Sequence, residues 1–327
     1  MPRRKDVAVV GHGSMGRHVA HMLTTDAALA PLVRTVTVGT SRPSAVGAPG
    51  VRTATVPQVL DDPSIDVVVV TTPSDTHEAI ALEALRNGKH VLVEKPASST
   101  PSGAERLREA ARHGGRAFAV VSQHRYAPDW RRVHDLIQDG ALGRVVSASV
   151  EIPLWRSDAY FASDPTRADA QLGNLAYHEV DLAVWCLGPV DRVAFCEHVR
   201  PDASRLVLSA GLVHRSGCLT TLSFSSAAFP GRTPRITFDG VCGSLVLEGD
   251  RLVLDARPPR ETVADSGLYL HPDRSSASSG DWLEPYRRQV AWFLASLDEG
   301  PLPALDDSAI ATIATIRSLQ HRIEERD

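Results

Sequence analysis

Short runs of β-branched residues alternate with helical stretches along the first third of the chain. The runs are VAVV at 7–10, VTV at 36–38, IDVVVV at 65–70, HVLV at 90–93 and AFAVV at 117–121. Strands separated by helix-length segments are typical of parallel sheets with crossover helices. Because the runs do not alternate apolar and polar positions, we expect helices on both faces of the sheet. The pattern predicts a doubly wound α/β domain over residues 1–122.

Helix boundary signals agree with this alternation. Thr100 before Pro101 predicts a capped helix start, and Gly114 and Gly115 mark its end. Asn87 and Gly88 end the preceding helix in the same way.

The pattern changes after Ser122, and residues 123–327 form a second predicted domain. Longer segments with polar alternation predict an antiparallel sheet; they are RVVSASVEI, RLVLSAGLVH, CLTTLSFSS, PRITFDG and GSLVLEG. Apolar residues at helical spacing predict helices over 174–187, 282–297 and 306–325. Two prolines and SSASSG predict an exposed loop over 256–280.

Composition and charge narrow the function classes. The 327 residues are 43% hydrophobic and 23% charged, as in ordinary globular proteins, with a net charge of −4. No basic run interleaves with aromatics, so we expect no nucleic-acid partner. Apolar stretches fall far short of the ~20 residues that span a bilayer, and no secretion signal is indicated. We therefore expect a cytoplasmic protein without a membrane partner.

The four cysteines carry no predicted chemistry. Cys186, Cys196, Cys218 and Cys242 lie far apart without a CxxC pair, so neither zinc spacing nor a disulfide framework is present. We interpret them as small core residues.

A glycine-rich turn follows the first strand and opens a helix at Ser14. In GHGSMG, Gly11, Gly13 and Gly16 suit a tight turn, a close backbone approach to a pyrophosphate, and close helix packing. The helix N-terminus would face the anion. This strand-turn-helix context predicts a dinucleotide site of the Rossmann type, although a glycine turn without a ligand has the same sequence.

The end of the second strand bears on the form of the dinucleotide. An NAD site usually carries a carboxylate roughly 20 residues after the glycines, but this chain has Gly39, Thr40, Ser41 and Arg42 there. Arg42 can pair with a 2′-phosphate and Ser41 can donate a hydrogen bond to it. We therefore expect NADP(H) in preference to NAD(H). The alternative is that Arg42 is a solvated loop charge and that both forms bind.

The segment TTPSDTHEAIALEALRNGKHVLVEKPAS at 71–98 closely resembles the Gfo/Idh/MocA oxidoreductase family, whose signature strand ends in Glu-Lys-Pro. Similarity continues through GALGRVVSASVEIPLWR at 140–156 and HEVDLAVWCLGPV at 178–190. The resemblance implies a Rossmann domain followed by an α/β domain with an open, mostly antiparallel sheet that serves substrate binding and oligomerisation. It also implies a sugar, cyclitol or related substrate between the domains.

The resemblance assigns roles to three residues. Lys95 would hold the substrate oxygen and stabilise its alkoxide character during hydride transfer. His178 would be the acid/base group, because imidazole titrates near neutrality. Asn174 stands four residues earlier, where relatives commonly carry Asp after a glycine run. Asn keeps hydrogen bonds but loses the charge, so His178 would be less readily protonated and the substrate pocket reshaped.

The remaining expected site residues follow from the glycine turn and the resemblance. Predicted cofactor contacts are Gly11, Gly13, Ser14, Met15, Gly16, Ser41, Arg42, Thr72, Pro73, His77, Glu94 and Lys95. Predicted substrate contacts are Lys95, Arg125, Tyr126, Trp155, Arg156, Asn174, Tyr177 and His178. Tyr160 or Tyr177 is an alternative proton donor if His178 is turned away, and Asp181 would support its helix or the domain junction. Metal binding at His178, Glu179 and Asp181 is not expected, because metal-ligand spacing is missing.

The sequence thus predicts an NADP(H)-dependent oxidoreductase that interconverts a secondary alcohol and a ketone on a sugar, nucleotide-sugar or cyclitol, with imine reduction as a lesser alternative. Two other classes stay open: a hydrolase or lyase of the same fold that reduces its cofactor only transiently, and a non-catalytic NADP-binding sensor. The resemblance also implies a homodimer or homotetramer packed through the open sheet face. We expect that face to be apolar, lined by SFSSAAF and RITF.

Overall fold

The computed structural model describes residues 3–43, 50–256, 283–298 and 301–326. The chain divides into two compact units. Unit 1 combines Met1–Gln123 with Leu283–Ile313, and unit 2 combines His124–Trp282 with Ala314–Asp327.

Unit 1 contains a six-stranded parallel sheet with strand order β3-β2-β1-β4-β5-β6. Its strands are β1 (Lys5–Val10), β2 (Val33–Gly39), β3 (Val51–Ala54), β4 (Val67–Val70), β5 (His90–Val93) and β6 (Phe118–Val120). Every residue of β1 and β4 is buried, as expected for central strands with helices on both faces. The predicted doubly wound parallel sheet is confirmed.

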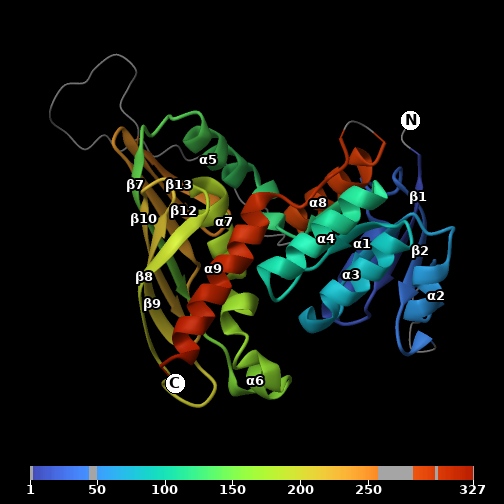
Figure 1. Cartoon of the computed structure of the whole chain (residues 1–327), viewed down its shortest axis with the longest axis horizontal. Coiled ribbons are helices and arrows are strands. Elements are labelled where there is room, and N and C mark those ends of the chain that lie inside the picture. The colour runs from blue at the N-terminus through green and yellow to red at the C-terminus, as the bar shows by residue number, and fades with distance from the viewer. Residues whose placement is uncertain (1–2, 44–49, 257–282, 299–300, 327) are drawn as a thin grey trace. The chain divides into compact units, whose positions relative to one another are not determined.

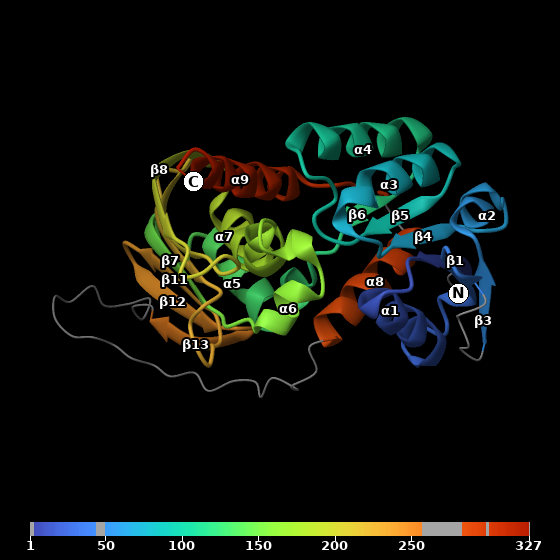
Figure 2. The same ribbon diagram turned by 90° about the horizontal axis from the view of Figure 1, so that it is seen from below.

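Helices cover both faces of this sheet. They are α1 (Ser14–Thr25), α2 (Val56–Asp61), α3 (His77–Arg86), α4 (Pro101–Gly114) and α8 (Glu284–Ser296), with a 3₁₀ turn η2 (Ser74–Thr76) before α3. Figure 2 shows α3 and α4 on one face and α1 and α8 on the other. The predicted end of α3 and the predicted start and end of α4 are confirmed. Thr100 Oγ1 accepts from the Gly103 N–H at 3.1 Å, Gly115 ends α4 at φ 61°, and Asn87 is the C-cap of α3.

Helix α8 returns to the N-terminal sheet from near the end of the chain. Tyr286, Val290 and Phe293 are buried in one hydrophobic cluster with residues of β1, α1 and β2. The buried Gln289 side chain accepts from the Ser122 N–H at 3.0 Å and donates to the Val120 carbonyl at 2.7 Å. These bonds fix α8 against the end of β6.

Unit 2 is built on a seven-stranded sheet with order β13-β12-β11-β7-β10-β9-β8. The strands are β7 (Val145–Pro153), β8 (Val190–Val199), β9 (Val207–His214), β10 (Leu219–Ser225), β11 (Arg235–Gly240), β12 (Gly243–Glu248) and β13 (Arg251–Ala256). Only β7 and β10 pair in parallel. The sheet is therefore mixed and mostly antiparallel, as predicted.

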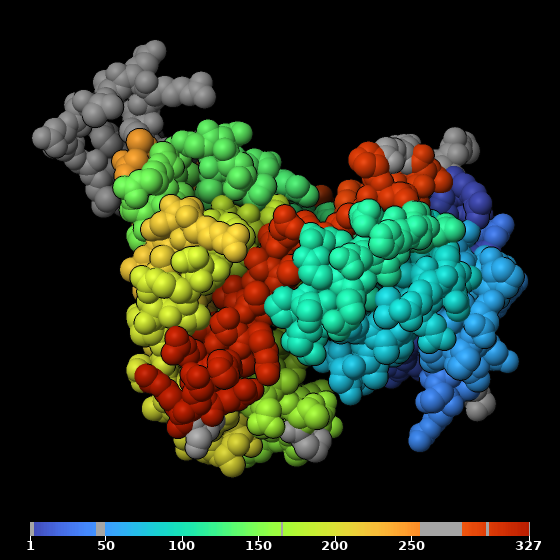
Figure 3. Space-filling view, viewed as in Figure 1, coloured from blue at the N-terminus to red at the C-terminus, as the bar shows by residue number. Residues whose placement is uncertain are grey.

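The helices of unit 2 lie on one face of this sheet (Figures 1 and 2). They include α5 (Pro128–Gln138), α6 (Asp158–Ala162), α7 (Tyr177–Leu187) and the residues of α9 (Asp307–Glu324) from Ala314 onward. Shorter helical turns are η3 (Gln123–Tyr126), η4 (Pro165–Arg167) and the π-helical η5 (Leu172–Ala176). Arg326, just after α9, forms an ion pair with Glu197 of β8, and Figure 3 shows the end of this helix against the yellow strands.

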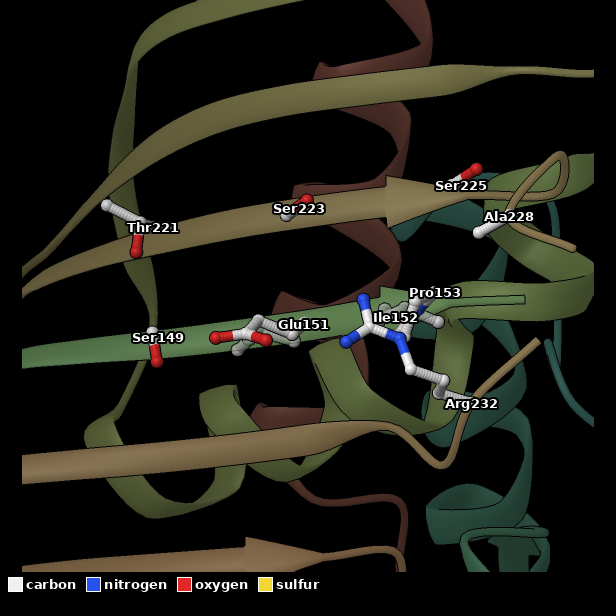
Figure 4. Close-up of a pocket in the computed structure, with 10 residues that line it drawn as sticks. Ser149, Glu151, Ile152, Pro153, Thr221, Ser223, Ser225, Ala228 and Arg232 are labelled. Carbon is white, nitrogen blue, oxygen red and sulfur yellow. The ribbon is translucent and has the colours of Figure 1, made fainter. Parts of the chain in front are cut away.

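Among the described residues, no helix covers the opposite face of the sheet. This face carries a pocket of about 360 Å³, lined by Ser149, Glu151, Thr221, Ser223, Ser225 and Arg232 among others (Figure 4). The prediction that SFSSAAF and RITF present apolar side chains here is wrong for the strand residues. Phe224, Ile236 and Phe238 are at most 2% exposed, because strand alternation turns them into the core and leaves Ser and Thr outside.

The predicted loop over 256–280 lies outside the described residues, apart from Ala256 at the end of β13. The part of the chain that the structure describes contains no helix long and apolar enough to cross a membrane.

Candidate functional site

The three glycines of the turn after β1 have different surroundings. Gly11 has a φ of +112°, and a Cβ there would lie 2.8 Å from the Thr71 backbone. A Cβ on Gly16 would lie 2.1 Å from the Gly11 carbonyl oxygen. By contrast, a Cβ on Gly13 would meet no atom within 4 Å. Gly11 and Gly16 thus let the turn close, while Gly13 keeps open the space before α1.

The N-terminus of α1 suits an anion. Gly13 is the N-cap residue and provides no side-chain cap, and the first turn holds no acidic residue. The first N–H groups of a helix carry partial positive charge and need an external acceptor. Within the described structure, the buried His12 Nδ1 also has no hydrogen-bond partner. Ser14 and Met15 follow as the first helical residues. A dinucleotide pyrophosphate fits this set of donors.

The loop after β2 presents the residues predicted to select the dinucleotide. The Thr40 N–H donates to the Ala54 carbonyl at 3.0 Å, which fixes the strand end against β3. Ser41 and Arg42 are exposed. Residues 39–43, where the description of this loop stops, contain no carboxylate. Nothing in this stretch would repel a 2′-phosphate.

His77 joins two segments that were expected at the cofactor. Its Nε2 lies 2.8 Å from the Thr72 carbonyl oxygen, and its Nδ1 lies 2.8 Å from the Pro96 carbonyl oxygen. His77 is 2% exposed. Thr76 Oγ1 adds bonds to Thr72 Oγ1 and the Pro73 carbonyl, both at 2.7 Å. The turn after β4 and the Glu-Lys-Pro turn after β5 are therefore held together by one imidazole.

Glu94 lies under Lys95 in the Glu-Lys-Pro turn. The Lys95 N–H donates to Glu94 Oε2 at 3.2 Å, and Glu94 Oε1 is buried. Burial raises the pKa of Glu94, opposed by the positive charge of Lys95. The pKa of the buried Tyr286 hydroxyl on α8 is raised well above 10, by burial and by Glu94. The residue directly before Lys95 is thus a buried carboxyl group, and its burial disfavours the charged form.

Unit 2 positions Asn174 and His178 on consecutive helical segments. Asn174 lies in the π-helical turn η5, and its N–H donates to the Ala170 carbonyl at 2.9 Å. His178 lies in the first turn of α7. Single π-helical turns such as η5 are frequent at functional sites. The π-helical turn ends at Ala176, and the first turn of α7 that follows contains the histidine that we expect to move a proton.

Arg125 is committed to Asp181 in the interior of unit 2. Its Nε donates to Asp181 Oδ2 at 2.7 Å and its Nη2 donates to Asp181 Oδ1. The side chains are 8% and 2% exposed. The guanidinium carbon also lies 5.5 Å from the Trp185 ring centroid. This pair ties Asp181 of α7 to η3, and Arg125 reaches any substrate only while holding Asp181.

The predicted aromatic residues have different surroundings. Trp155 lies edge-on to Phe229, with ring centroids 5.4 Å apart. Tyr160 has the guanidinium carbons of Arg156 and Arg167 at 5.5 Å and 4.4 Å from its ring centroid. Tyr126 similarly has the Arg131 guanidinium at 5.8 Å. Tyr177 is fully buried, edge-on to His178 at 5.9 Å.

One residue that was not expected at the site, His124, lies beside His178, and a second, Asp250, is bonded to His124. The His124 ring is edge-on to His178, with centroids 4.8 Å apart. His124 Nδ1 lies 2.6 Å from Asp250 Oδ1 in the turn between β12 and β13. His124 stands directly before Arg125, which was predicted as a substrate contact. Asp250 lies 126 positions further on, and no local pattern connects it to the site.

The cysteines behave as core residues, with one exception. Cys186, Cys196 and Cys218 are buried, whereas Cys242 is exposed. Burial raises the pKa of Cys218 to about 11. Within the described residues, no group of three or more His, Cys, Asp or Glu side chains is arranged to hold a metal ion.

Family models match both halves of the chain. Residues 5–122 match the model described as "Oxidoreductase family, NAD-binding Rossmann fold", and residues 130–246 match the "GFO/IDH/MocA C-terminal domain". The chain belongs to the Gfo/Idh/MocA family. The resemblance seen in the Glu-Lys-Pro and HEVDLAVWCL segments is confirmed, and a pyridine nucleotide is the cofactor for which the N-terminal domain of this family is described.

Curated relatives are similar over part of their length. Inositol 2-dehydrogenase 2 of Saccharopolyspora erythraea is 31% identical over 187 residues, covering 56% of this chain and 54% of the relative. The scyllo-inositol 2-dehydrogenase (NADP(+)) IolW of Bacillus subtilis is 26% identical over 59% of this chain and 54% of the relative. The chain thus spans about half the length of the curated relatives it matches.

Solved structures share the fold over nearly the whole chain. The WlbA dehydrogenase of Bordetella pertussis, in complex with NADH and UDP-GlcNAcA, aligns with a TM-score of 0.81 at 21% identity, covering 99% of this chain and 97% of the other. A putative myo-inositol dehydrogenase of Sinorhizobium meliloti aligns with a TM-score of 0.75 at 23% identity, covering 99% and 98%. At these identities the likeness shows the fold.

Proposed function

We propose that this protein is an NADP(H)-dependent oxidoreductase that interconverts a secondary alcohol and a ketone on a sugar, nucleotide-sugar or cyclitol. The glycine turn carries the proposal, because Gly11 and Gly16 are packed against backbone while the space at Gly13 stays open. Relatives named as inositol dehydrogenases, one of them as NADP(+)-dependent, support the substrate class.

The choice of NADP(H) rests on the loop after β2. Exposed Ser41 and Arg42 offer a hydroxyl donor and a guanidinium to the 2′-phosphate, and residues 39–43 lack the carboxylate that an NAD site uses for the ribose. A guanidinium and a phosphate form paired, charge-assisted hydrogen bonds. Arg42 would therefore make the protein bind NADP(H) more tightly than NAD(H), which has no 2′-phosphate.

The proposed chemistry divides between two side chains. When bound, the nicotinamide supplies or accepts the hydride at the carbinol carbon. His178 takes the hydroxyl proton during oxidation and returns it during reduction. Lys95 donates to the same oxygen and offsets its negative charge in the transition state. His77 keeps the Glu-Lys-Pro turn against the turn after β4, so that Lys95 starts from a fixed backbone.

A turnover assay tests this proposal. Purified protein is incubated with NADP⁺ or NAD⁺ and a panel of cyclitols, sugars and nucleotide-sugars, and reduced nicotinamide is followed by absorbance. Net reduction with at least one polyol, faster with NADP⁺, is expected. Lys95→Ala and His178→Gln should each lower turnover by about 100-fold or more while cofactor affinity is largely retained. Normal turnover in Lys95→Ala would show that the Glu-Lys-Pro lysine has no part in the chemistry.

The same assay separates the other classes. Product formed without any net change in nicotinamide absorbance indicates the same-fold hydrolase or lyase. Cofactor binding without any product indicates a non-catalytic sensor. Loss of activity in Tyr160→Phe or Tyr177→Phe, with activity kept in His178→Gln, would move the proton transfer to a tyrosine.

The proposal includes the state of the protein in the cell. We expect a cytoplasmic homodimer or homotetramer that packs through the uncovered face of the seven-stranded sheet. Small hydroxyl side chains predominate on the β7 and β10 part of that face, beside the charged Glu151 and Arg232, so a second sheet there would meet a polar surface. Sedimentation at several protein concentrations tests the assembly, and a monomer throughout would exclude it.

A further inference from the structure

We propose that Asp250 and His124 act on His178 as positioning residues, a charged pair that keeps the His178 ring neutral and therefore ready to accept a proton. The inference rests on the proposed function, because it assigns the proton transfer to His178. It adds a preference for alcohol oxidation, the direction in which that group starts as a base.

The geometry brings three segments of unit 2 together. His124 in η3 donates from Nδ1 to Asp250 Oδ1 at 2.6 Å. The His124 ring also lies edge-on to the His178 ring, with centroids 4.8 Å apart. The His124 and Asp250 side chains are 31% and 28% exposed, so solvent screens the pair only in part. The Asp250 carboxylate thus contacts the His124 imidazole, and the His124 imidazole contacts that of His178, the proposed acid/base group.

The turn that carries Asp250 is held in place by α5. Trp130 Nε1 donates to the Gly249 carbonyl at 3.0 Å. Asp129 Oδ2 accepts from the Leu252 N–H at 2.9 Å. The residues on both sides of Asp250 are therefore anchored to the same helix. Asp250 is presented to His124 from a fixed backbone, unlike an exposed ion pair between two long side chains.

Charges around the pair favour a protonated His124. Burial disfavours the charged ring, but Asp250, through its hydrogen bond and charge, and the Glu179 and Asp181 charges on α7 raise the pKa of His124 above its usual 6.5. Asp181 is itself neutralised by Arg125. Asp250 is therefore the acidic group on which the His124 charge mainly depends.

A protonated His124 disfavours a second positive charge on His178. Two imidazolium rings with centroids 4.8 Å apart repel each other. The proposal requires that this repulsion outweigh the attraction of the Asp250 carboxylate, which is bonded to His124. The neutral Asn174 in η5 brings no carboxylate to the start of α7, although Glu179 lies next along that helix. The His124–Asp250 pair and Asn174, which stands where relatives commonly carry Asp, would both favour the neutral form of His178.

The test is a titration of histidine side chains in the full chain by NMR. The imidazole signals of His124 and His178 are assigned by their loss in His124→Gln and His178→Gln. In the wild type, His178 should titrate at lower pH than free imidazole, and His124 at higher pH. In Asp250→Asn, the His124 midpoint should fall, and the His178 midpoint should rise by about half to one pH unit as the neighbouring positive charge is lost.

Asp191→Asn is the matched control, because Asp191 is an exposed carboxylate of β8. It should leave both midpoints unchanged. His124→Gln should also raise the His178 midpoint, which keeps the test valid if one variant folds poorly. A His178 midpoint that is the same in the wild type, Asp250→Asn and His124→Gln would overturn the inference.

Enzyme kinetics provides a second, separate readout. For alcohol oxidation, the acid limb of the pH profile of kcat/KM should move to higher pH in Asp250→Asn and His124→Gln, with little change in KM. A merely structural role would lower the melting temperature without moving that limb, and this result would also overturn the inference. If no alcohol is oxidised at all, the proposed function fails, while the NMR midpoints still decide whether His124 and Asp250 control His178.

Discussion

Arg125 and Asp181 form a bidentate ion pair in the interior of unit 2, with side chains only 8% and 2% exposed. The pair joins η3 to the middle of α7, three residues after His178. Removing one charge of such a pair leaves the other buried and uncompensated, which is costly. The pair therefore fixes the helix on which the proposed acid/base group lies.

Arg125→Leu should lower the free energy of unfolding by about 3–5 kcal/mol, because Asp181 is then left buried without its cation. Urea denaturation followed by circular dichroism measures the change. Arg235→Ala is the control, since the Arg235–Glu248 pair is exposed on both sides at 47% and should contribute less than about 1 kcal/mol. Equal effects of the two substitutions would contradict the structural role of Arg125.

The glycine turn predicts opposite outcomes for two similar substitutions. Gly16→Ala places a Cβ 2.1 Å from the Gly11 carbonyl oxygen and should destabilise the fold by about 1–3 kcal/mol. Gly13→Ala meets no atom within 4 Å and should leave stability almost unchanged, yet weaken dinucleotide binding by about tenfold or more, because the methyl group occupies the phosphate approach. Unchanged dinucleotide affinity in Gly13→Ala would argue against a pyrophosphate at α1.

Arg42→Ala should weaken NADPH binding by about tenfold or more, the loss expected for a charge-assisted hydrogen bond. NADH binding should stay the same, because NADH lacks the 2′-phosphate. Arg86→Ala, at an exposed position in α3, removes the same charge elsewhere in unit 1 and is the control. Calorimetric titration with each nucleotide gives the affinities. A parallel loss for NADH and NADPH would mean that Arg42 attracts both forms without discriminating between them.

His90 makes the stability of unit 1 depend on pH. Its Nδ1 accepts a hydrogen bond from the Ala117 N–H at 2.9 Å, and burial, with help from Arg116, lowers its pKa from 6.5 to about 4. Between pH 6.5 and 4 the unfolded chain binds a proton that the native state does not bind, so stability must fall as the pH falls through this window. Above pH 6.5 the contribution is fully present.

The substitution His90→Asn keeps an acceptor but removes the titration. Relative to this variant, the wild type should lose roughly 1–3 kcal/mol more of its unfolding free energy between pH 7 and pH 4.5, because each pH unit between the two pKa values of His90 costs about 1.4 kcal/mol. His113→Asn, at an exposed position in α4, should keep the wild-type dependence. Identical slopes in the wild type and His90→Asn would contradict this role of His90.

Much of the fold follows from local sequence patterns. Runs such as VVVV at 67–70 predict buried central strands because every position is apolar and β-branched. The strand β3 was not predicted, since VRTA at the sheet edge has no buried residue and no alternation. The strand β8 was missed for a related reason, because only Cys196 among its ten residues is buried. Edge strands are formed by pairing with a neighbour, which a local pattern does not reveal.

In the candidate site, too, some residues belong to local sequence motifs and others come together only through tertiary packing. The glycine turn, the Glu-Lys-Pro turn and the Asn174–His178 segment are contiguous motifs, so each could be found from the sequence. His124 and Asp250 meet through tertiary packing across 126 positions. The packing of Gln289 against Ser122 likewise joins residues 167 positions apart. Neither contact has a sequence periodicity that could predict it.

The central claim is that the glycine turn and the loop after β2 bind a phosphorylated pyridine dinucleotide. A fluorescence titration tests it most directly, using energy transfer from the five tryptophans to the reduced nicotinamide of NADPH or, separately, NADH. The account predicts saturable transfer with both nucleotides and clearly tighter binding of NADPH. Equal affinities would remove Arg42 from the account, and no transfer with either nucleotide from folded protein would contradict the proposed function.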